Sequence, residues 1–369
     1  MSQYILVIYT TAIIFPIIAI FITLPILVVN YHRYGALPKW RIFMLYTFVF
    51  YMMCAYFLTI LPLPSRSFVA HLTTPTHNFI PFTFILEFFK YNPFALRHPG
   101  TWLAALKAPT VIQPAFNILL TVPFGFYLHY YFRRTWKQTV LISFGLSLFF
   151  EITQLTGLYG IYPRPYRLFD VDDLMLNTLG GWLGVGLANG LSGILPTQES
   201  VRQRTMAKSQ NVSAFRRLAA LAVDWIIISI VSVPFDLMIK SSSVNRLITP
   251  ILWLIFILLA EMIFQKTLGM RLVKINVINK HGGRANWYQL ILRNFFAYGV
   301  IGGVFGADTY LLDLTGTAPM SQMGMIHLGI LITSIILLFV MVDLLIDTFA
   351  KRHRLFFEHL SGTDTQGNA

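Results

Sequence analysis

The chain has 369 residues, of which 56% are apolar and only 12% are charged, and its mean hydropathy is +0.65. Because soluble domains carry about 25% charged residues, this composition excludes a soluble enzyme, a disordered tail and a fibrous protein, and it indicates a polytopic membrane protein. The net charge of +13 lies mostly in short loops between apolar segments, which indicates membrane topology rather than nucleic-acid binding. A single cysteine, Cys54, excludes an intrachain disulfide, and zinc-type Cys/His spacings are absent, so we expect no metal and no cofactor.

Nine apolar segments reach or approach the length of about 20 residues that a helix needs to cross a bilayer. They are residues 5–29, 42–61, 115–132, 139–158, 174–195, 218–239, 247–264, 287–305 and 325–346. With nine spans, most lysines and arginines fall on one side, and the positive-inside rule then places the N-terminus outside and the C-terminus inside. The segment 287–305 is short and rich in glycine, so a re-entrant segment is an alternative there.

The expected fold is therefore an all-α polytopic integral membrane protein with about nine transmembrane helices. Five precede and four follow a polar, basic linker at residues 199–211, which separates a first domain, residues 1–198, from a second, residues 212–365. The outer loop 62–114 is long and rich in proline and aromatic residues, such as Phe82, Phe84, Phe88 and Phe89. It is either an aromatic anchor at the membrane interface or a lid over a cavity that opens outward.

Polar side chains gather at one depth in the first domain. Ser147, Glu151 and Gln154 recur at i, i+4 and i+7, on one helix face. The full cluster is Asn117, Ser147, Glu151, Gln154, Arg164, Arg167, Asp172, Asp173 and Asn177. The cluster has two interpretations. In the first, Asp172 and Asp173 only cap a helix and the nearby glycines only permit close helix packing. In the second, the cluster is a ligand-binding site near the outer leaflet.

These residues resemble the VanZ-like family over roughly residues 40–195. The resemblance rests on Asn78-Phe79-Ile80-Pro81-Phe82, on the segment from Asn117 to Gly125, on Ser147, Glu151, Gln154, Arg167, Asp172 and Asp173, and on Asn177-Thr178-Leu179-Gly180-Gly181. It implies a multi-pass protein of the bacterial plasma membrane. The family takes its name from resistance to the glycopeptide antibiotic teicoplanin, and the resemblance supplies no reaction and no ligand.

In the second domain the polar residues are expected to face the cytosol. Arg217 and Asp224 are seven residues apart on one helix face, which makes them the favoured buried ion pair. The alternative is an ion or proton pathway that uses Asp224, Glu261 and Asp343. Apolar residues alternate with polar ones before a glycine turn, which predicts a small cytosolic β-hairpin near residues 271–284.

This second domain resembles the RDD family, which is named for one arginine and two aspartates. The residues that carry the resemblance, or that we group with it, are Arg216, Arg217, Asp224, Thr267, Gly269, Arg293 and Glu358. Either Arg216 or Arg217 fits the arginine, and Glu358 stands where an aspartate is usual. The resemblance implies a membrane domain with suspected transport roles and no defined activity.

Motifs of ATP-driven motors, zinc proteases and α/β-hydrolases are absent from the sequence, so we favour a non-enzymatic protein. The leading hypothesis is an envelope protein that binds a membrane lipid or a lipid-linked envelope precursor at the outer polar cluster, with Arg164 and Arg167 holding anionic groups. The second is a transporter or ion-coupled permease that uses acidic residues of both domains. The third is a membrane-embedded hydrolase or transferase with Glu151 as general acid or base.

Overall fold

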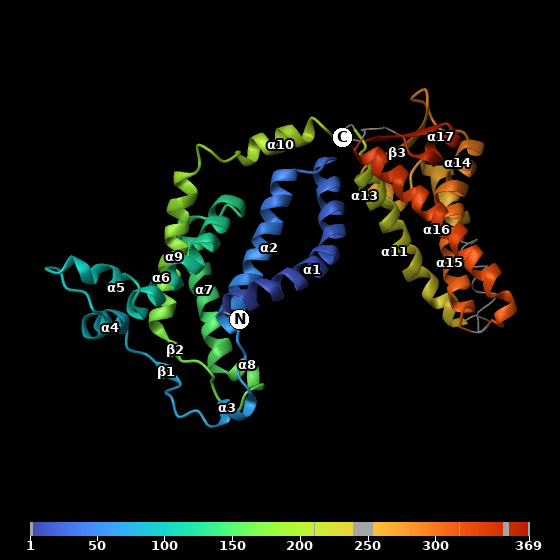
Figure 1. Ribbon diagram of the computed structural model, residues 1–369. Coiled ribbons are helices and arrows are strands. Elements are labelled where there is room, and N and C mark those ends of the chain that lie inside the picture. Colours follow the sequence, from blue (N-terminus) through green and yellow to red (C-terminus); the bar gives the residue numbers. More distant parts are fainter. Residues whose placement is uncertain (1–2, 210, 239–253, 317, 350–353, 368–369) are drawn as a thin grey trace. The chain divides into compact units, whose positions relative to one another are not determined.

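The structure, a computed structural model, describes residues 3–209, 211–238, 254–316, 318–349 and 354–367, which are predominantly helical (Figure 1). The chain divides into two compact units. Unit 1 comprises Met1–Ile20 and Lys39–Gln198, and unit 2 comprises Phe21–Pro38 and Glu199–Ala369. The long first helix, α1 (Gln3–Tyr34), therefore contributes its first part to unit 1 and its last part to unit 2.

Unit 1 consists of helices joined by one long loop region. Besides α1, its helices are α2 (Lys39–Ile60), α3 (Arg66–Ala70), α4 (Thr83–Tyr91), α5 (Trp102–Leu106), α6 (Pro109–Phe126), α7 (Trp136–Leu155), α8 (Gly157–Gly160) and α9 (Val171–Gly190), with a 3-10 turn η1 (Pro99–Thr101) and a π-helical turn η2 (Tyr127–Tyr131). Two short strands, β1 (His77–Asn78) and β2 (Phe169–Asp170), pair in parallel and join the long loop to the start of α9.

Helices α6, α7 and α9 pack closely because small residues line their contacts. A Cβ atom added at Gly180 or Gly184 of α9 would overlap with the backbone of Ile118 or Val122 on α6. Small residues let helix backbones approach in this way inside a membrane. The same approach brings the polar residues of the three helices together.

Unit 2 combines helices with one small sheet. Its elements are the end of α1, α10 (Gln198–Met206), α11 (Ala214–Met238), the helix Leu254–Phe264, α13 (Leu268–Leu272), β3 (Ile275–Asn279), α14 (Trp287–Asn294), the π-helical turn η3 (Phe295–Val300), α15 (Ile301–Leu314), α16 (Met320–Phe349), α17 (Phe356–Ser361) and β4 (Thr363–Gly367). Val273, Ile275 and Val277 are buried in its core with Tyr31 of α1.

The hairpin expected near residues 271–284 forms only in part. Strand β3 and the glycine turn are present, but the returning chain makes a single bridge, between Ile278 and Arg284. The main partner of β3 is β4, which pairs with it antiparallel from Ile275–Gly367 to Asn279–Thr363. Alternating residues specify a strand but not its partner, so this pairing across the unit corrects the local one.

Six helices of the described residues are long and apolar enough to cross a membrane. They are Val7–Tyr34, Lys39–Ile60, Pro109–Tyr131, Trp136–Leu155, Trp287–Leu314 and Met320–Asp343. The segment 287–305, for which a re-entrant segment was the alternative, lies within the 28-residue helix Trp287–Leu314. Helix α9 covers most of the fifth expected span and α11 almost all of the sixth, while residues 239 and 247–253 of the sixth and seventh lie outside the described residues. The chain is an all-α polytopic membrane protein, and nine spans and their orientation stay predictions.

Candidate functional site

The polar cluster expected near the outer leaflet, here called the outer polar cluster, forms where α6, α7 and α9 meet. Asn117 of α6 donates from Nδ2 to the Asp173 carboxylate on α9. Asn177, one turn further along α9, donates from Nδ2 to Ser147 Oγ on α7 at 2.9 Å. Ser147 Oγ donates in turn to the backbone oxygen of Asp173 at 3.3 Å. Residues far apart in the sequence thus form one connected network.

The orientation of the Asn177 amide follows from this network. Ser147 has a single hydroxyl hydrogen, which the Asp173 carbonyl receives, so its oxygen is left to accept from Asn177 Nδ2. The amide oxygen of Asn177 then faces away from Ser147. Asn177 is only 5% exposed, and its Oδ1 has no hydrogen-bond partner among the described residues. A buried acceptor without a donor costs about 1–3 kcal/mol.

Glu151 lies one turn after Ser147 on α7 and is only 2% exposed. Its Oε2 accepts the backbone N–H of Asp170 at 3.0 Å, and within the described part of the chain its Oε1 accepts no hydrogen bond. Asp170 is the N-cap of α9, where its side chain accepts from the backbone N–H of Asp172. Burial raises the pKa of Asp170 above its usual value of 3.8. The cluster is therefore rich in buried acceptor oxygens.

Both arginines of the cluster bind backbone carbonyls. Arg167 donates from Nη1 to Thr59 O at 2.8 Å and from Nη2 to Leu61 O at 2.9 Å. The terminal nitrogens of Arg164 likewise donate to the carbonyls of Leu72 and Thr74. These guanidinium groups hold the loop after α2 in place.

Gln154 joins the same end of α2, because its Nε2 donates to Thr59 O at 3.1 Å. Thr59 O therefore receives donors from both Gln154 and Arg167. The end of α2 is in this way attached to the polar cluster.

Asp172 fixes the start of the aromatic segment. Its carboxylate accepts the backbone N–H of Phe82 at 2.6 Å and of Phe84 at 3.0 Å, which satisfies the free N–H groups at the start of α4. Asn78 and Thr83, which the spacing argument did not single out, complete this contact through Asp170 and Asp172. No residue of α4 is buried, and Phe89 is 80% exposed. An exposed apolar helix is thus held directly beside the polar cluster.

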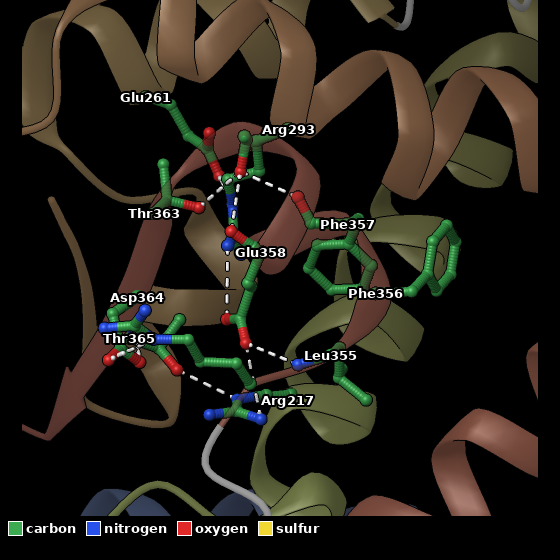
Figure 2. Close-up of polar contacts among 12 residues, drawn as sticks. Arg217, Glu261, Arg293, Leu355, Phe356, Phe357, Glu358, Thr363, Asp364 and Thr365 are labelled. Carbon is green, nitrogen blue, oxygen red and sulfur yellow. Dashed lines mark hydrogen bonds and ion pairs between the residues drawn. The ribbon is translucent and has the colours of Figure 1, made fainter. Parts of the chain in front are cut away.

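Unit 2 contains a second polar cluster, which is buried. Figure 2 shows Glu358 between two arginines, with Oε1 3.3 Å from Arg293 Nη1 and Oε2 3.4 Å from Arg217 Nη1. Arg293 Nε also lies 3.5 Å from Glu261 Oε1. Glu358 and Glu261 are fully buried. Each charge thus has an opposite charge close by, as burial in a membrane domain requires.

The sequence favoured Asp224 as the partner of Arg217, and the structure gives Asp224 other contacts. Its carboxylate accepts from Thr267 Oγ1 at 2.6 Å, from the backbone N–H of Gly269 at 2.7 Å and from Tyr298 Oη at 3.2 Å. Gly269 is needed here, because a Cβ atom would overlap with the Ala220 carbonyl. Asp224 therefore anchors the loop before α13.

Arg216 has a different role from its neighbour. Its Nε, Nη1 and Nη2 donate to the backbone oxygens of Val273, Ser209 and Lys274 at 2.8, 2.7 and 2.6 Å. Asp343, named in the alternative ion pathway, accepts the backbone N–H of Phe356 at 3.0 Å and so holds the start of α17.

Comparisons with known proteins assign both parts of the chain. The family model described as VanZ/LLP1 matches residues 48–192, and the RDD family model matches residues 212–358. No curated protein and no solved structure matches the chain. The chain is thus a VanZ-like domain followed by an RDD family domain, and it is a multi-pass membrane protein of the cell envelope.

Proposed function

We propose that the VanZ-like domain binds the polar headgroup of a membrane lipid or a lipid-linked envelope precursor in the outer leaflet of the bacterial plasma membrane. The observation that carries this proposal is Asn177 Oδ1, a buried acceptor without a donor among the described residues, near Glu151, whose Oε1 accepts no hydrogen bond there. Buried polar groups in proteins are nearly always satisfied by a partner. A bound headgroup with N–H or O–H groups would supply the two missing donors.

The aromatic segment supports a ligand that lies at the membrane interface. Phe79, Phe82, Phe89 and Tyr91 are each at least half exposed, and Asp172 holds the start of this segment against α9. Aromatic side chains favour the headgroup level of a bilayer. A segment anchored there would lie close to the headgroup of any lipid bound by the cluster.

The test is lipid retention by the purified full-length protein, measured by native mass spectrometry after delipidation and exposure to a bacterial polar lipid extract. Glu151→Gln and Asn177→Ala are expected to lower retention about tenfold each, because a hydrogen bond to a buried acceptor contributes about 1–3 kcal/mol. Glu87→Gln, a substitution at an exposed residue of α4, is the matched control. Retention that is the same in all four proteins contradicts the proposal.

We further propose that headgroup binding by this domain contributes to teicoplanin resistance in cells. Cells that express the protein are expected to tolerate more teicoplanin than cells that express Glu151→Gln at the same membrane level. Equal teicoplanin susceptibility of the two kinds of cell would show that headgroup binding does not produce resistance.

Transport is the second candidate function, and one observation favours it. Asp224 and Thr267 line a small cavity of about 10 Å³ in the RDD domain, next to Ile227 and Ile257. This volume is close to the minimum for one water molecule, which could carry a proton to a buried carboxylate. Flux of protons or monovalent cations in proteoliposomes, lost in Asp224→Asn at an unchanged protein level, would support this function. No flux in any imposed gradient would exclude it.

A further inference from the structure

An apolar groove of about 370 Å³ runs between α1 and α2 in unit 1. Ile14 and Ile18 line it from α1, and Phe48, Met52 and Tyr56 are among the residues that line it from α2. The volume falls within the range of about 300–1,000 Å³ that small-molecule sites occupy. Methionine side chains adapt to irregular apolar surfaces, so Met52 and its neighbour Met53 suit a flexible hydrocarbon chain.

The groove ends beside the outer polar cluster. Tyr56 lies one turn before Thr59, whose carbonyl receives the side chains of Gln154 and Arg167. The Tyr56 ring also stacks on Phe149 of α7, with ring centroids 6.4 Å apart and an interplanar angle of 25°. An apolar surface and a polar cluster thus adjoin through α2 and α7, as the chain and the headgroup of one lipid molecule would require.

The cluster atoms without partners indicate the chemistry of the headgroup. Glu151 Oε1 and Asn177 Oδ1 are acceptors, which need donors, and Arg164 Nε is a buried donor that has no partner among the described residues. The terminal nitrogens of Arg164 and Arg167 already donate to backbone carbonyls. The cluster contains the carboxyl groups of Glu151, Asp172 and Asp173 and the guanidinium groups of Arg164 and Arg167, and Arg164 Nε can still donate to one acceptor. The site therefore suits a headgroup that carries N–H or O–H donors, alone or beside a phosphate, better than a bare phosphate.

We propose that the ligand is a lipid whose hydrocarbon chain occupies the α1–α2 groove and whose headgroup presents N–H or O–H donors to Glu151 and Asn177. This inference rests on the proposed function, because it specifies the ligand of the same cluster. It adds a second binding surface, the groove, and it excludes lipids whose headgroup lacks donors.

The experiment uses two photoreactive probes with the same diazirine-bearing acyl chain, phosphatidylethanolamine and phosphatidylcholine. Both headgroups are zwitterionic, and only the ethanolamine has N–H donors. The full-length protein is placed with either probe in phosphatidylcholine nanodiscs, whose headgroups carry no N–H or O–H donor, and the labelled peptides are mapped by mass spectrometry. We expect the ethanolamine probe to label residues 14–18 and 48–57 about tenfold more than the choline probe.

Two substitutions of neighbouring residues on α1 test the groove itself. Ile18→Trp fills the groove and is expected to reduce labelling of these peptides by about tenfold. Ile17→Trp, at an exposed position of the same helix, should leave labelling unchanged. Because the map on the unmodified protein needs no variant, the inference is tested even if Ile18→Trp does not fold.

The outcomes separate this inference from the proposed function. Labelling of the groove that depends on the ethanolamine headgroup and on Glu151 supports both. Equal labelling by the two probes overturns the inference. A headgroup preference that depends on Glu151, with the label outside the groove, overturns the inference and leaves the proposed function standing. Labelling that is indifferent to Glu151→Gln and Asn177→Ala with every probe overturns both.

Discussion

Asp172 accepts the backbone N–H of Phe82, which precedes it by 90 residues, at 2.6 Å. Phe82 has a φ of 65°, in the left-handed region that a phenylalanine rarely adopts. The carboxylate therefore holds the loop in a conformation that costs about 1–2 kcal/mol on its own. The start of α4 depends on a side chain of α9.

Replacing Asp172 with alanine is expected to release the aromatic segment while the helices stay packed. The N–H groups of Phe82 and Phe84 would lose their acceptor, so hydrogen exchange in residues 79–91 should become about tenfold faster or more. Exchange in α6 and α9 should stay unchanged. Glu87→Gln, on the same segment, serves as the control. Protection of residues 79–91 equal to that of the unmodified protein would show that Asp172 does not hold this loop.

The two glycines Gly184 and Gly186 of α9 make a matched pair. A Cβ atom at Gly184 would overlap with the Val122 carbonyl, whereas a Cβ atom at Gly186 meets no atom within 4 Å. We expect Gly184→Ala to destabilise the protein by about 1–3 kcal/mol, because overpacking moves the backbone of α6 or α9. Gly186→Ala should be neutral or stabilising by about 0.5–1 kcal/mol. Thermal unfolding of the purified variants measures both, and equal effects would contradict the packing described for α9.

Glu358 and Asp364 contrast a buried ion pair with a partly exposed one in the same domain. Glu358→Ala would leave Arg217 and Arg293 without a shared carboxylate in a buried site, which costs about 3–5 kcal/mol. Asp364→Ala breaks the pair with Arg354, whose side chain is 31% exposed, and should cost about 1 kcal/mol or less. Thermal unfolding gives both values. Similar losses in the two variants would mean that Glu358 contributes no more than a surface charge.

Asp170 predicts a pH dependence of stability. Burial raises its pKa in the folded protein, so the folded state binds this proton more tightly than the unfolded state does. The stabilising contribution is complete below the unfolded pKa and is lost as pH rises through the folded pKa. Asp170→Asn removes this titration and keeps an N-cap acceptor. The melting temperature of the variant minus that of the unmodified protein should rise between pH 4 and pH 7, and a constant or falling difference would contradict the shift.

The meeting of Asn117, Ser147, Asp173 and Asn177 was predictable from the sequence. Helical spacing predicts which residues share a helix face, and hydropathy predicts their depth in the bilayer. Polar residues at one depth on neighbouring helices are therefore expected to contact one another. The position of Glu151 in the same cluster was predictable for the same reason. Asp170 is not among the residues predicted for the cluster, although it precedes the fifth expected span, where an N-cap is expected.

The contacts of Arg164, Arg167 and Asp172 were not predictable in this way. Their partners are backbone groups about 90–108 residues away in the chain, and a backbone carbonyl leaves no signature in a sequence. The pairing of Arg217 shows a related limit. Asp224 follows Arg217 by seven residues on the same helix, whereas Glu358 lies far away in the chain, and only the fold determines which carboxylate Arg217 meets.

The three hydrogen bonds of Arg216 join the chain before α11 to the two residues that precede β3. A lysine there has one ammonium group instead of a planar fork, so it cannot hold three carbonyls in the same geometry. The guanidinium group of Arg216 has its complete set of acceptors only after the backbone carbonyls of Ser209, Val273 and Lys274 have all folded into place. A partly assembled form of the RDD domain that lacks one of these carbonyls leaves a donor of the buried guanidinium group unpaired, which costs about 1–3 kcal/mol.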